Sequence, residues 1–171
     1  MVLADPQGSG LYNSIKYGVM YSSTEKEGTR RRHQVDSLIE GIGLNRLTKN
    51  FEKGQPRIRE AVKVTDAMAV GMGRWLIKND GNSYYYEVLM AGLFVGSSSC
   101  VNLCAAVHVA RQLGPGHRIV TILCDSGARH LSKFYNDAWL KGHGIEVRES
   151  YDDLDFLDQA QDAENVFKHE K

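Results

Sequence analysis

The sequence predicts an α/β fold with a doubly wound, mostly parallel sheet and helices on both faces. Short apolar runs typical of buried strands alternate along the chain with stretches of helical periodicity. Glycine and serine lie where several of these runs meet the helices, as is common at the carboxyl ends of parallel strands. The first apolar run begins directly after Met1, so we expect the fold to be incomplete at its N-terminus.

The first half of the chain is predicted to contain two strands and two helices, with a helical turn between them. The turn Gly8-Ser9-Gly10 favours a helix start, Thr65-Asp66 is typical of a helix cap, and residues 22 to 36 are polar enough for a loop. The predicted elements are a strand at Val2-Leu3-Ala4, a helix with Leu11, Ile15 and Val19 on one face, a turn from Arg46 to Phe51 before a break at Lys53-Gly54-Gln55-Pro56, a strand at Ala61 to Val64, and a helix with Met68, Met72, Trp75 and Leu76 on one face, ended by Asn79-Asp80-Gly81.

The second half is predicted to continue the alternation. The helix that begins near Cys100 is apolar almost all round, which predicts burial between layers. The predicted elements are a strand at Leu93-Phe94-Val95, the helix from about Cys100 to Leu113, a strand from Ile119 to Leu123, a helix from about Ala128 to Lys141 with Leu131, Tyr135, Ala138 and Trp139 facing inward and Gly142 as its C-cap, and a last strand at Ile145-Glu146-Val147.

Charge divides the chain into two regions. Residues 1–150 are predicted to form one portion of a folded domain, and residues 151–171 a charged tail. From Asp152 onward this tail is expected to be either a solvated amphipathic helix or a frayed end.

The composition excludes a dedicated nucleic-acid binder, because 21 basic and 21 acidic residues leave a formal net charge of +0. The basic run Thr29 to His33 is flanked by acidic residues and is interpreted as a solvated loop, with an anion or partner contact as the alternative. Three cysteines without a CxxC pair favour a reducing compartment. No apolar run approaches the roughly 20 residues of a membrane span, and we expect an intracellular protein.

The strongest site prediction is the junction Val120 to Ser132, VTILCDSGARHLS. An apolar run ends there at Asp125-Ser126-Gly127 and passes directly into a helical pattern, which is a typical place for a bound ligand. The Ser126 hydroxyl can donate to or accept from a ring nitrogen without forcing a charge on it. Asp125 is interpreted as a helix cap, and His130 as a structural residue with a proton shuttle as the alternative.

Two further junctions carry weaker signals. Gly96-Ser97-Ser98-Ser99 is either a simple N-cap or a donor set for an anion, and Glu40-Gly41-Ile42-Gly43 would let the main chain approach a flat ligand. Cys100 and Cys104 lie one helical turn apart but are interpreted as small core residues, and no metal site is predicted. Cys124 is likewise predicted to pack at a strand end.

Four segments taken in order resemble one enzyme family. Ala4-Asp5-Pro6-x-Gly8-Ser9, Glu40-Gly41-Ile42-Gly43, Gly92 to Ser98 and Asp125 to Ser132 are together similar to the C-terminal half of the cysteine synthase and cystathionine β-synthase group of pyridoxal phosphate (PLP) enzymes, of the tryptophan synthase β-subunit-like fold. The resemblance covers roughly residues 2 to 142. The amino-acid sequence between Tyr21 and Gly43 is most similar to the fungal mitochondrial cysteine synthase-like branch.

The resemblance implies a transferase or lyase that acts in cysteine biosynthesis by β-replacement on O-acetylserine or serine, with sulfide as second substrate. It implies PLP as cofactor, with Ser126 at its pyridine nitrogen and Gly41, Ile42 and Gly43 beside cofactor and substrate. It also implies a homodimer in the full-length protein, in the mitochondrion or the cytoplasm.

The family's Schiff-base lysine, phosphate loop and substrate-carboxylate loop correspond to positions upstream of Asp5-Pro6. We therefore expect no catalytic residue in this chain and little turnover by it alone. The alternatives are a truncated isoform or pseudoenzyme that acts as a binding protein, and an enzyme of the cystathionine β-synthase or serine dehydratase type. Residues 82–92 form an atypical insertion, explained either by a gene-model error or by a surface hairpin.

Overall fold

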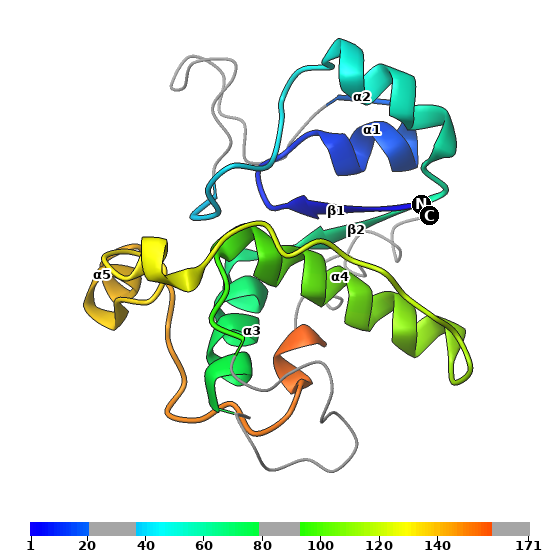
Figure 1. The fold of residues 1–171 in the computed structure, drawn as a ribbon. Coiled ribbons are helices and arrows are strands. Elements are labelled where there is room, and N and C mark those ends of the chain that lie inside the picture. Colours follow the sequence, from blue (N-terminus) through cyan, green and yellow to red (C-terminus); the bar gives the residue numbers. More distant parts are fainter. Residues whose placement is uncertain (21–36, 79–92, 159–171) are drawn as a thin grey trace, which may run out of the picture. The chain divides into compact units, whose positions relative to one another are not determined.

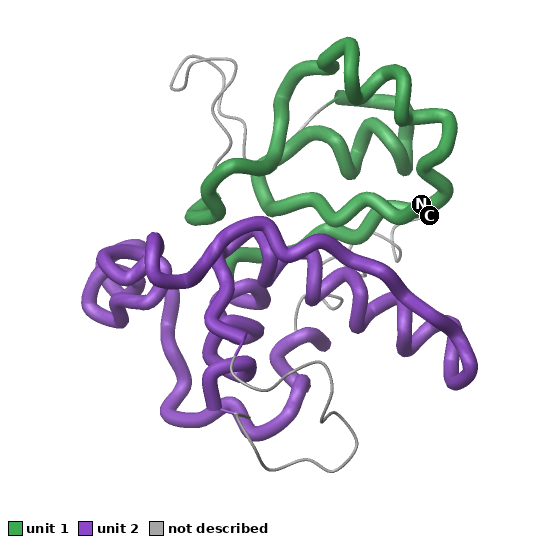
Figure 2. Tube along the Cα trace, viewed as in Figure 1, with its two compact units in different colours: residues 1–66 green, residues 67–171 purple. Residues whose placement is uncertain are grey.

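A computed structural model describes residues 1–20, 37–78 and 93–158 of the chain. These residues fall into two compact units, Met1–Asp66 and Ala67–Lys171, which Figure 2 draws in different colours. Each unit is described by itself. The predictions for the basic run Thr29 to His33 and for the insertion 82–92 lie outside the described residues.

The first unit contains a parallel pair of strands, β1 (Val2–Pro6) and β2 (Glu60–Val64) (Figure 1). Their register runs from Val2 opposite Glu60 to Pro6 opposite Val64. Both strand predictions are confirmed, and so is the parallel pairing expected of an α/β fold. The buried side chains of β2 contribute to the core of this unit.

Two helices accompany the strands of the first unit. α1 (Leu11–Tyr17) packs against both strands and ends at Gly18, whose φ of 72° is left-handed. Val19 lies beyond this end and is exposed, so it does not belong to the predicted inner face. α2 (Lys49–Gly54) passes directly into a 3-10 turn, η1 (Gln55–Arg57), where a break was predicted. The α-helix thus ends within the predicted break, and Pro56 lies at the start of the 3-10 turn, where proline is well accommodated.

The second unit is built on two long helices, α3 (Asp66–Lys78) and α4 (Ser97–Leu113). α3 begins at the last residue of the first unit, and its predicted inner face is buried, as Met68, Met72, Trp75 and Leu76 show. α4 starts three residues earlier than predicted. It is buried in its first half but exposed in its last turn, so the prediction of burial all round is wrong for that end.

Three strands predicted in the second unit do not form: Leu93 to Val95, Ile119 to Leu123 and Ile145 to Val147. In the described residues their only pairing is an isolated antiparallel bridge between Val95 and Ser126. A strand needs a neighbouring backbone as well as a suitable sequence, and no described segment pairs with Ile119 to Leu123 as a strand. Val120 is consequently 87% exposed and Ile122 71% exposed.

The helix predicted over 128–141 is divided into two pieces, the 3-10 turn η2 (Gly127–His130) and α5 (Asp137–Gly142). The His130 carbonyl accepts hydrogen bonds from both Lys133 and Tyr135, which closes the first piece. The Asn136 side chain then accepts from the amide of Trp139 and starts a new helix. Its C-cap is His143, one residue beyond the predicted Gly142. Leu131 falls between the two pieces and is exposed instead of facing inward.

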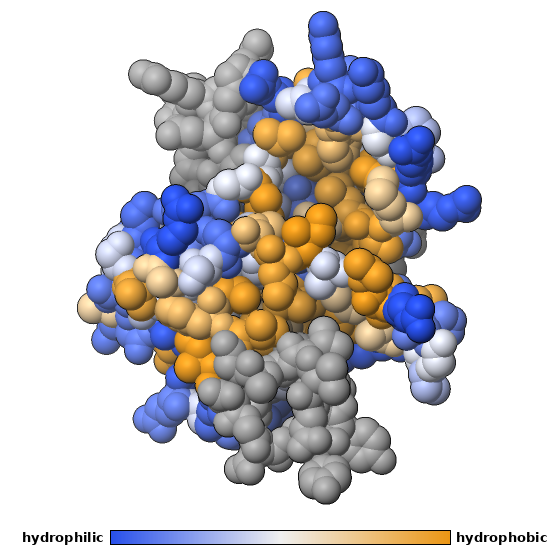
Figure 3. Space-filling model, in the orientation of Figure 1, coloured by the Kyte–Doolittle hydropathy of each residue, from blue (hydrophilic) through white to orange (hydrophobic). Residues whose placement is uncertain are grey.

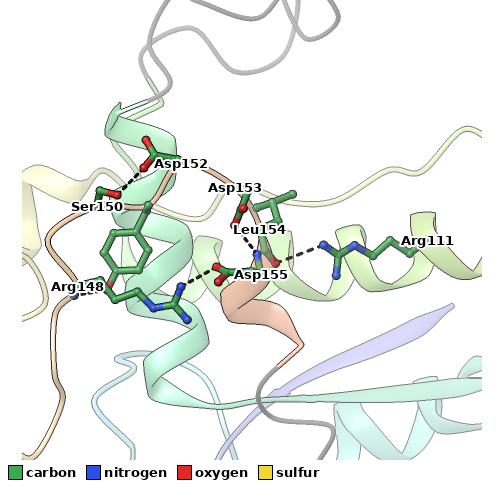
Figure 4. Close-up of polar contacts among 8 residues, drawn as sticks. Arg111, Arg148, Ser150, Asp152, Asp153, Leu154 and Asp155 are labelled. Carbon is green, nitrogen blue, oxygen red and sulfur yellow. Dashed lines mark hydrogen bonds and ion pairs between the residues drawn. The ribbon is translucent and has the colours of Figure 1, made fainter.

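The segment 148–158 packs within the second unit (Figure 4). Arg148 pairs with Asp155 at 2.6 Å, and Arg111 of α4 donates to Asp158 at 2.8 Å and to the carbonyl of Leu154 at 3.3 Å. Apolar anchors accompany these contacts, since Tyr151, Phe156 and Leu157 are buried around the 3-10 turn η3 (Asp155–Leu157). The start of the predicted solvated tail is therefore part of a core.

None of the helices in the described ranges combines the length and the apolar character needed to cross a membrane.

Candidate functional site

Ser126 lies on a backbone that is fixed on both sides. It forms the bridge to Val95, and the next amide, that of Gly127, donates to the Phe94 carbonyl at 3.0 Å. On its other side, the carbonyl of Asp125 accepts from the Gly96 amide at 2.9 Å. The segment that leads into α4 therefore holds the predicted ligand-binding serine in place.

The Ser126 side chain is accessible. Ser126 is an exposed residue, and its hydroxyl oxygen accepts from the Ala128 amide at 3.3 Å, which caps η2. A hydroxyl that accepts one hydrogen bond still has its proton to donate. Ser126 can therefore offer a neutral donor to a ligand atom.

Gly127 permits a close approach of chain segments beneath this serine. A side chain at Gly127 would lie 2.7 Å from the ring of Phe94 and 2.9 Å from that of Tyr135. These two rings pack at 4.7 Å between centroids, and the Tyr135 hydroxyl donates to the Val95 carbonyl at 2.6 Å. Burial raises the pKa of Tyr135 well above its usual range, so Tyr135 acts as a neutral donor. The helical pattern places Tyr135 on an inner face, but does not reveal this contact.

The serine run at the start of α4 is buried. Gly96 precedes the helix without a side-chain cap, and Ser97, Ser98 and Ser99 are all in the interior. The Ser99 hydroxyl accepts from the Cys124 amide at 2.8 Å. Ser99 thus ties α4 to the segment that carries Ser126, a role that sequence reasoning missed.

The cysteines divide into two kinds. Cys100 and Cys104 are fully buried, as predicted for small core residues. Burial raises the pKa of the Cys100 thiol to about 12 and that of Cys104 well above its usual range, so neither is a reactive thiolate. Cys124 is exposed, and the prediction that it packs at the end of a buried strand is wrong because that strand does not form.

The glycine loop Gly41-Ile42-Gly43 lies in the first unit. Gly41 and Gly43 have φ values of 87° and 90°, a left-handed conformation that side chains disfavour. A Cβ on Gly41 would meet nothing within 4 Å, and the residue is exposed. The main chain at Gly41 is therefore not covered by neighbouring side chains.

Both ends of this loop are fixed by hydrogen bonds. At its C-terminal end, the Ser9 hydroxyl donates to the Leu44 carbonyl at 3.1 Å and accepts from the Leu44 amide at 3.0 Å. At its N-terminal end, Asp66 accepts from the Ser37 hydroxyl at 2.6 Å and from the Leu38 amide at 2.8 Å. Sequence reasoning assigned Asp66 only to a helix cap and missed its role in holding this loop.

Gln7 joins Ser37 and Leu38 as a hydrogen-bond partner of Asp66, and we call these four residues the Asp66 cluster. Its amide nitrogen donates to Asp66 Oδ2 at 3.1 Å, and its amide oxygen accepts from the Asp66 backbone at 3.0 Å. Gln7 follows β1 directly, so the end of the strand, the start of α3 and the glycine loop meet at one carboxylate. The candidate site in this unit is consequently held by contacts between distant parts of the chain.

Asp5 supports α1 from below. It is 1% exposed, and its Oδ2 accepts from the Tyr12 amide at 2.7 Å in the first turn of the helix. Burial raises the pKa of this carboxyl to about 6. Asp5 belongs to the first of the four segments that carry the family resemblance. Its role in this structure is to support the first turn of α1.

Comparisons with known proteins identify relatives with a shared name. No family model matches the chain. It is 55% identical over 148 residues to Cysteine synthase 2 of Emericella nidulans, covering 86% of this chain and 32% of the relative. It is 53% identical over 156 residues to Cysteine synthase 2 of Schizosaccharomyces pombe, covering 91% and 36%. The chain thus spans about a third of the length of these curated relatives.

Cystathionine β-synthases are also similar. Cystathionine beta-synthase of Mus musculus is 35% identical over 148 residues, covering 85% of this chain and 21% of the relative. The solved structure of an O-acetylserine dependent cystathionine beta-synthase from Helicobacter pylori superposes with a TM-score of 0.52 at 28% identity, covering 77% of this chain and 32% of that one. The similarity in structure confirms the predicted fold class. Over the matched segment, the chain is a homologue of the cysteine synthase and cystathionine β-synthase family.

Proposed function

We propose that this chain carries part of the binding surface of a cysteine synthase-like enzyme that uses PLP for β-replacement on O-acetylserine or serine. The names of the relatives support this reaction class. The observation that carries the proposal is the exposed hydroxyl of Ser126 on a backbone fixed at Asp125 and Gly127.

The residues at this junction fit the cofactor's ring nitrogen. A neutral hydroxyl can donate to an unprotonated pyridine nitrogen, and no buried charge has to be compensated there. When bound, PLP withdraws electrons from the α-carbon of an amino acid and so permits exchange of the β-substituent. The task of Ser126 is to hold the ring nitrogen by one hydrogen bond and leave it neutral.

We also propose that the loop Gly41-Ile42-Gly43, described within the first unit, contacts the cofactor, as the family resemblance implies. Its left-handed glycines expose main-chain groups, and its ends are fixed at Leu44 and Asp66. Because its glycines have no side chains, the main chain of this fixed loop can approach a flat ring closely. The homodimer, sulfide as second substrate and a mitochondrial or cytoplasmic location stay predictions.

A pair of ligands tests the role of Ser126. Pyridoxine 5′-phosphate has the cofactor's ring nitrogen and phosphate but no aldehyde, so it forms no covalent bond with lysines. Its 1-deaza analogue carries a carbon in place of the ring nitrogen. The ratio of the two Kd values, measured by calorimetry on the 171-residue protein, isolates the nitrogen contact.

We expect the wild-type chain to prefer pyridoxine 5′-phosphate by about 2- to 12-fold, the value of one net hydrogen bond of about 0.5–1.5 kcal/mol. Ser126→Ala should bring the ratio to about 1. Ser132→Ala, another exposed serine on the same segment, is the matched control and should leave it unchanged. Equal ratios in wild type and Ser126→Ala, or failure of the wild type to bind either ligand, would refute the proposal for this chain.

One observation favours a second candidate function, association with another polypeptide. Four apolar side chains of the segment Ile119 to Leu123 are exposed, namely Ile119, Val120, Ile122 and Leu123. Figure 3 colours the residues by hydropathy. Such segments accept a β-strand from a second chain. Analytical ultracentrifugation of wild type against Val120→Lys/Ile122→Lys tests this: loss of a self-associated species in the variant supports it, and monomers in both exclude self-association.

A further inference from the structure

A partly buried hydrogen bond between two side chains lies directly beside Ser126. His130 Nε2 and Asp125 Oδ2 are 2.8 Å apart, and the His130 side chain is only 7% exposed. An ionised carboxylate can only accept, so Nε2 carries the proton and donates. This contact spans the turn in which Ser126 and Gly127 lie.

The pair is pressed against the residue that precedes α4. A Cβ on Gly96 would lie 1.8 Å from Asp125 Oδ1 and 2.9 Å from His130 Nε2, so only glycine leaves room for the two side chains. The Gly96 amide also donates to the Asp125 carbonyl. Asp125 therefore contacts Gly96 through both its backbone and its side chain.

The second carboxylate oxygen has a distinct environment. Asp125 Oδ1 is buried and has no hydrogen-bond partner among the residues that the structure describes. It lies beside Gly96, where α4 begins without a side-chain cap. The amino end of a helix favours a negative charge, and this interaction keeps the carboxylate turned toward α4 while Oδ2 faces His130.

These contacts act on Ser126 through its neighbours. Asp125 is held to Gly96 and His130, and Gly127 donates to the Phe94 carbonyl. If the side-chain pair is broken, Asp125 keeps only its backbone hydrogen bond with Gly96. The direction of the Ser126 hydroxyl then depends on the remaining backbone contacts alone.

We propose that Asp125 and His130 form a positioning pair that holds the Ser126 hydroxyl in the direction needed to donate to a ring nitrogen of a bound ligand. This proposal rests on the proposed function for the identity of the ligand. In this proposal both members of the pair act through Ser126.

Two substitutions of equal length separate the hydrogen bond from mere packing. His130→Gln places an amide Nε2 donor near the position of the imidazole Nε2, whereas His130→Met has similar length and no donor. We expect the Kd ratio of 1-deaza analogue to pyridoxine 5′-phosphate to fall to less than half its wild-type value in His130→Met and to recover in His130→Gln. His143→Met, at an exposed histidine of the same unit, is the control.

The outcomes distinguish the two proposals. A ratio that collapses in Ser126→Ala but keeps its wild-type value in His130→Met overturns the positioning pair and leaves the proposed function standing. Equal weakening of both ligands in His130→Met and His130→Gln assigns His130 a merely structural role and also overturns it. If His130→Met does not fold, Asp125→Asn and Asp125→Leu repeat the comparison from the other side of the contact.

A measurement without ligand judges the pair even if the proposed function fails. Hydrogen exchange of the Gly96 and Gly127 amides reports directly on the two backbone contacts beside Ser126. In His130→Met we expect both amides to exchange at least fivefold faster relative to the Gly114 amide at the far end of α4. Unchanged exchange would overturn the proposal regardless of ligand binding.

Discussion

Asp5 makes the stability of the first unit depend on pH. Its carboxyl is buried beneath α1, and burial raises its pKa from 3.8 to about 6, although the Ser9 side chain, the Tyr12 amide and the charge of Lys63 partly oppose the shift. A raised carboxyl pKa means that the folded state holds the proton more tightly than the unfolded state. Stability is therefore highest at low pH with respect to this group, and it falls as the pH rises from about 4 to about 6.

The size of the effect follows from the two pKa values. A difference of about two pKa units corresponds to about 3 kcal/mol over the whole titration, of which about 2 kcal/mol falls between pH 4 and pH 7. Asp5→Asn removes the titrating group, and its amide oxygen can still accept from Tyr12. We expect the decrease in free energy of unfolding between pH 4 and pH 7 to shrink by about 2 kcal/mol in this variant.

Urea titrations followed by circular dichroism at several pH values provide the assay. Glu52→Gln, which neutralises an exposed carboxylate of the same unit, should keep the wild-type pH dependence. If Asp5→Asn also keeps it, Asp5 is not the group responsible and the assignment of the raised pKa is wrong.

Two further predictions concern packing in the second unit. Gly96→Ala should cost about 1–3 kcal/mol of stability, because the new methyl group displaces the Asp125 carboxylate, whereas Gly142→Ala, with nothing within 4 Å, should be nearly neutral; thermal unfolding measures both. Phe156→Ala should cost about 3–5 kcal/mol as a buried aromatic, while Arg148→Gln, which removes a partly exposed ion pair, should cost no more than about 1 kcal/mol. Equal losses in the two members of either pair would contradict the packing argument.

The sequence predicted those elements whose signals are local. β1, β2 and the inner face of α3 follow from apolar runs and periodicity, and the structure confirms them. The position of Ser126 at a junction after an apolar run was equally visible. Its assignment to a ring nitrogen came from the family resemblance, because a serine before a glycine has many possible roles.

Features that depend on distant partners could not be predicted. The run Ile119 to Leu123 has the composition of a buried strand, but no described segment pairs along it. Phe156 packs where a side chain at Gly71 would lie 2.7 Å from its ring, a contact that neither segment reveals alone. The contacts of Asp66 also join segments whose meeting no local pattern indicates.

The Asp66 cluster also has a kinetic consequence. Gln7 and Asp66 are 59 residues apart in sequence, and Ser9 and Leu44 are 35 apart. Loops of this length close slowly compared with helix formation, because chain entropy is lost before the contacts form. The glycine loop can take its final position only after the two ends of this unit have met. We therefore expect α1 and α2 to form early in folding, and the loop Gly41-Ile42-Gly43 to be among the last parts of the unit to reach its native conformation.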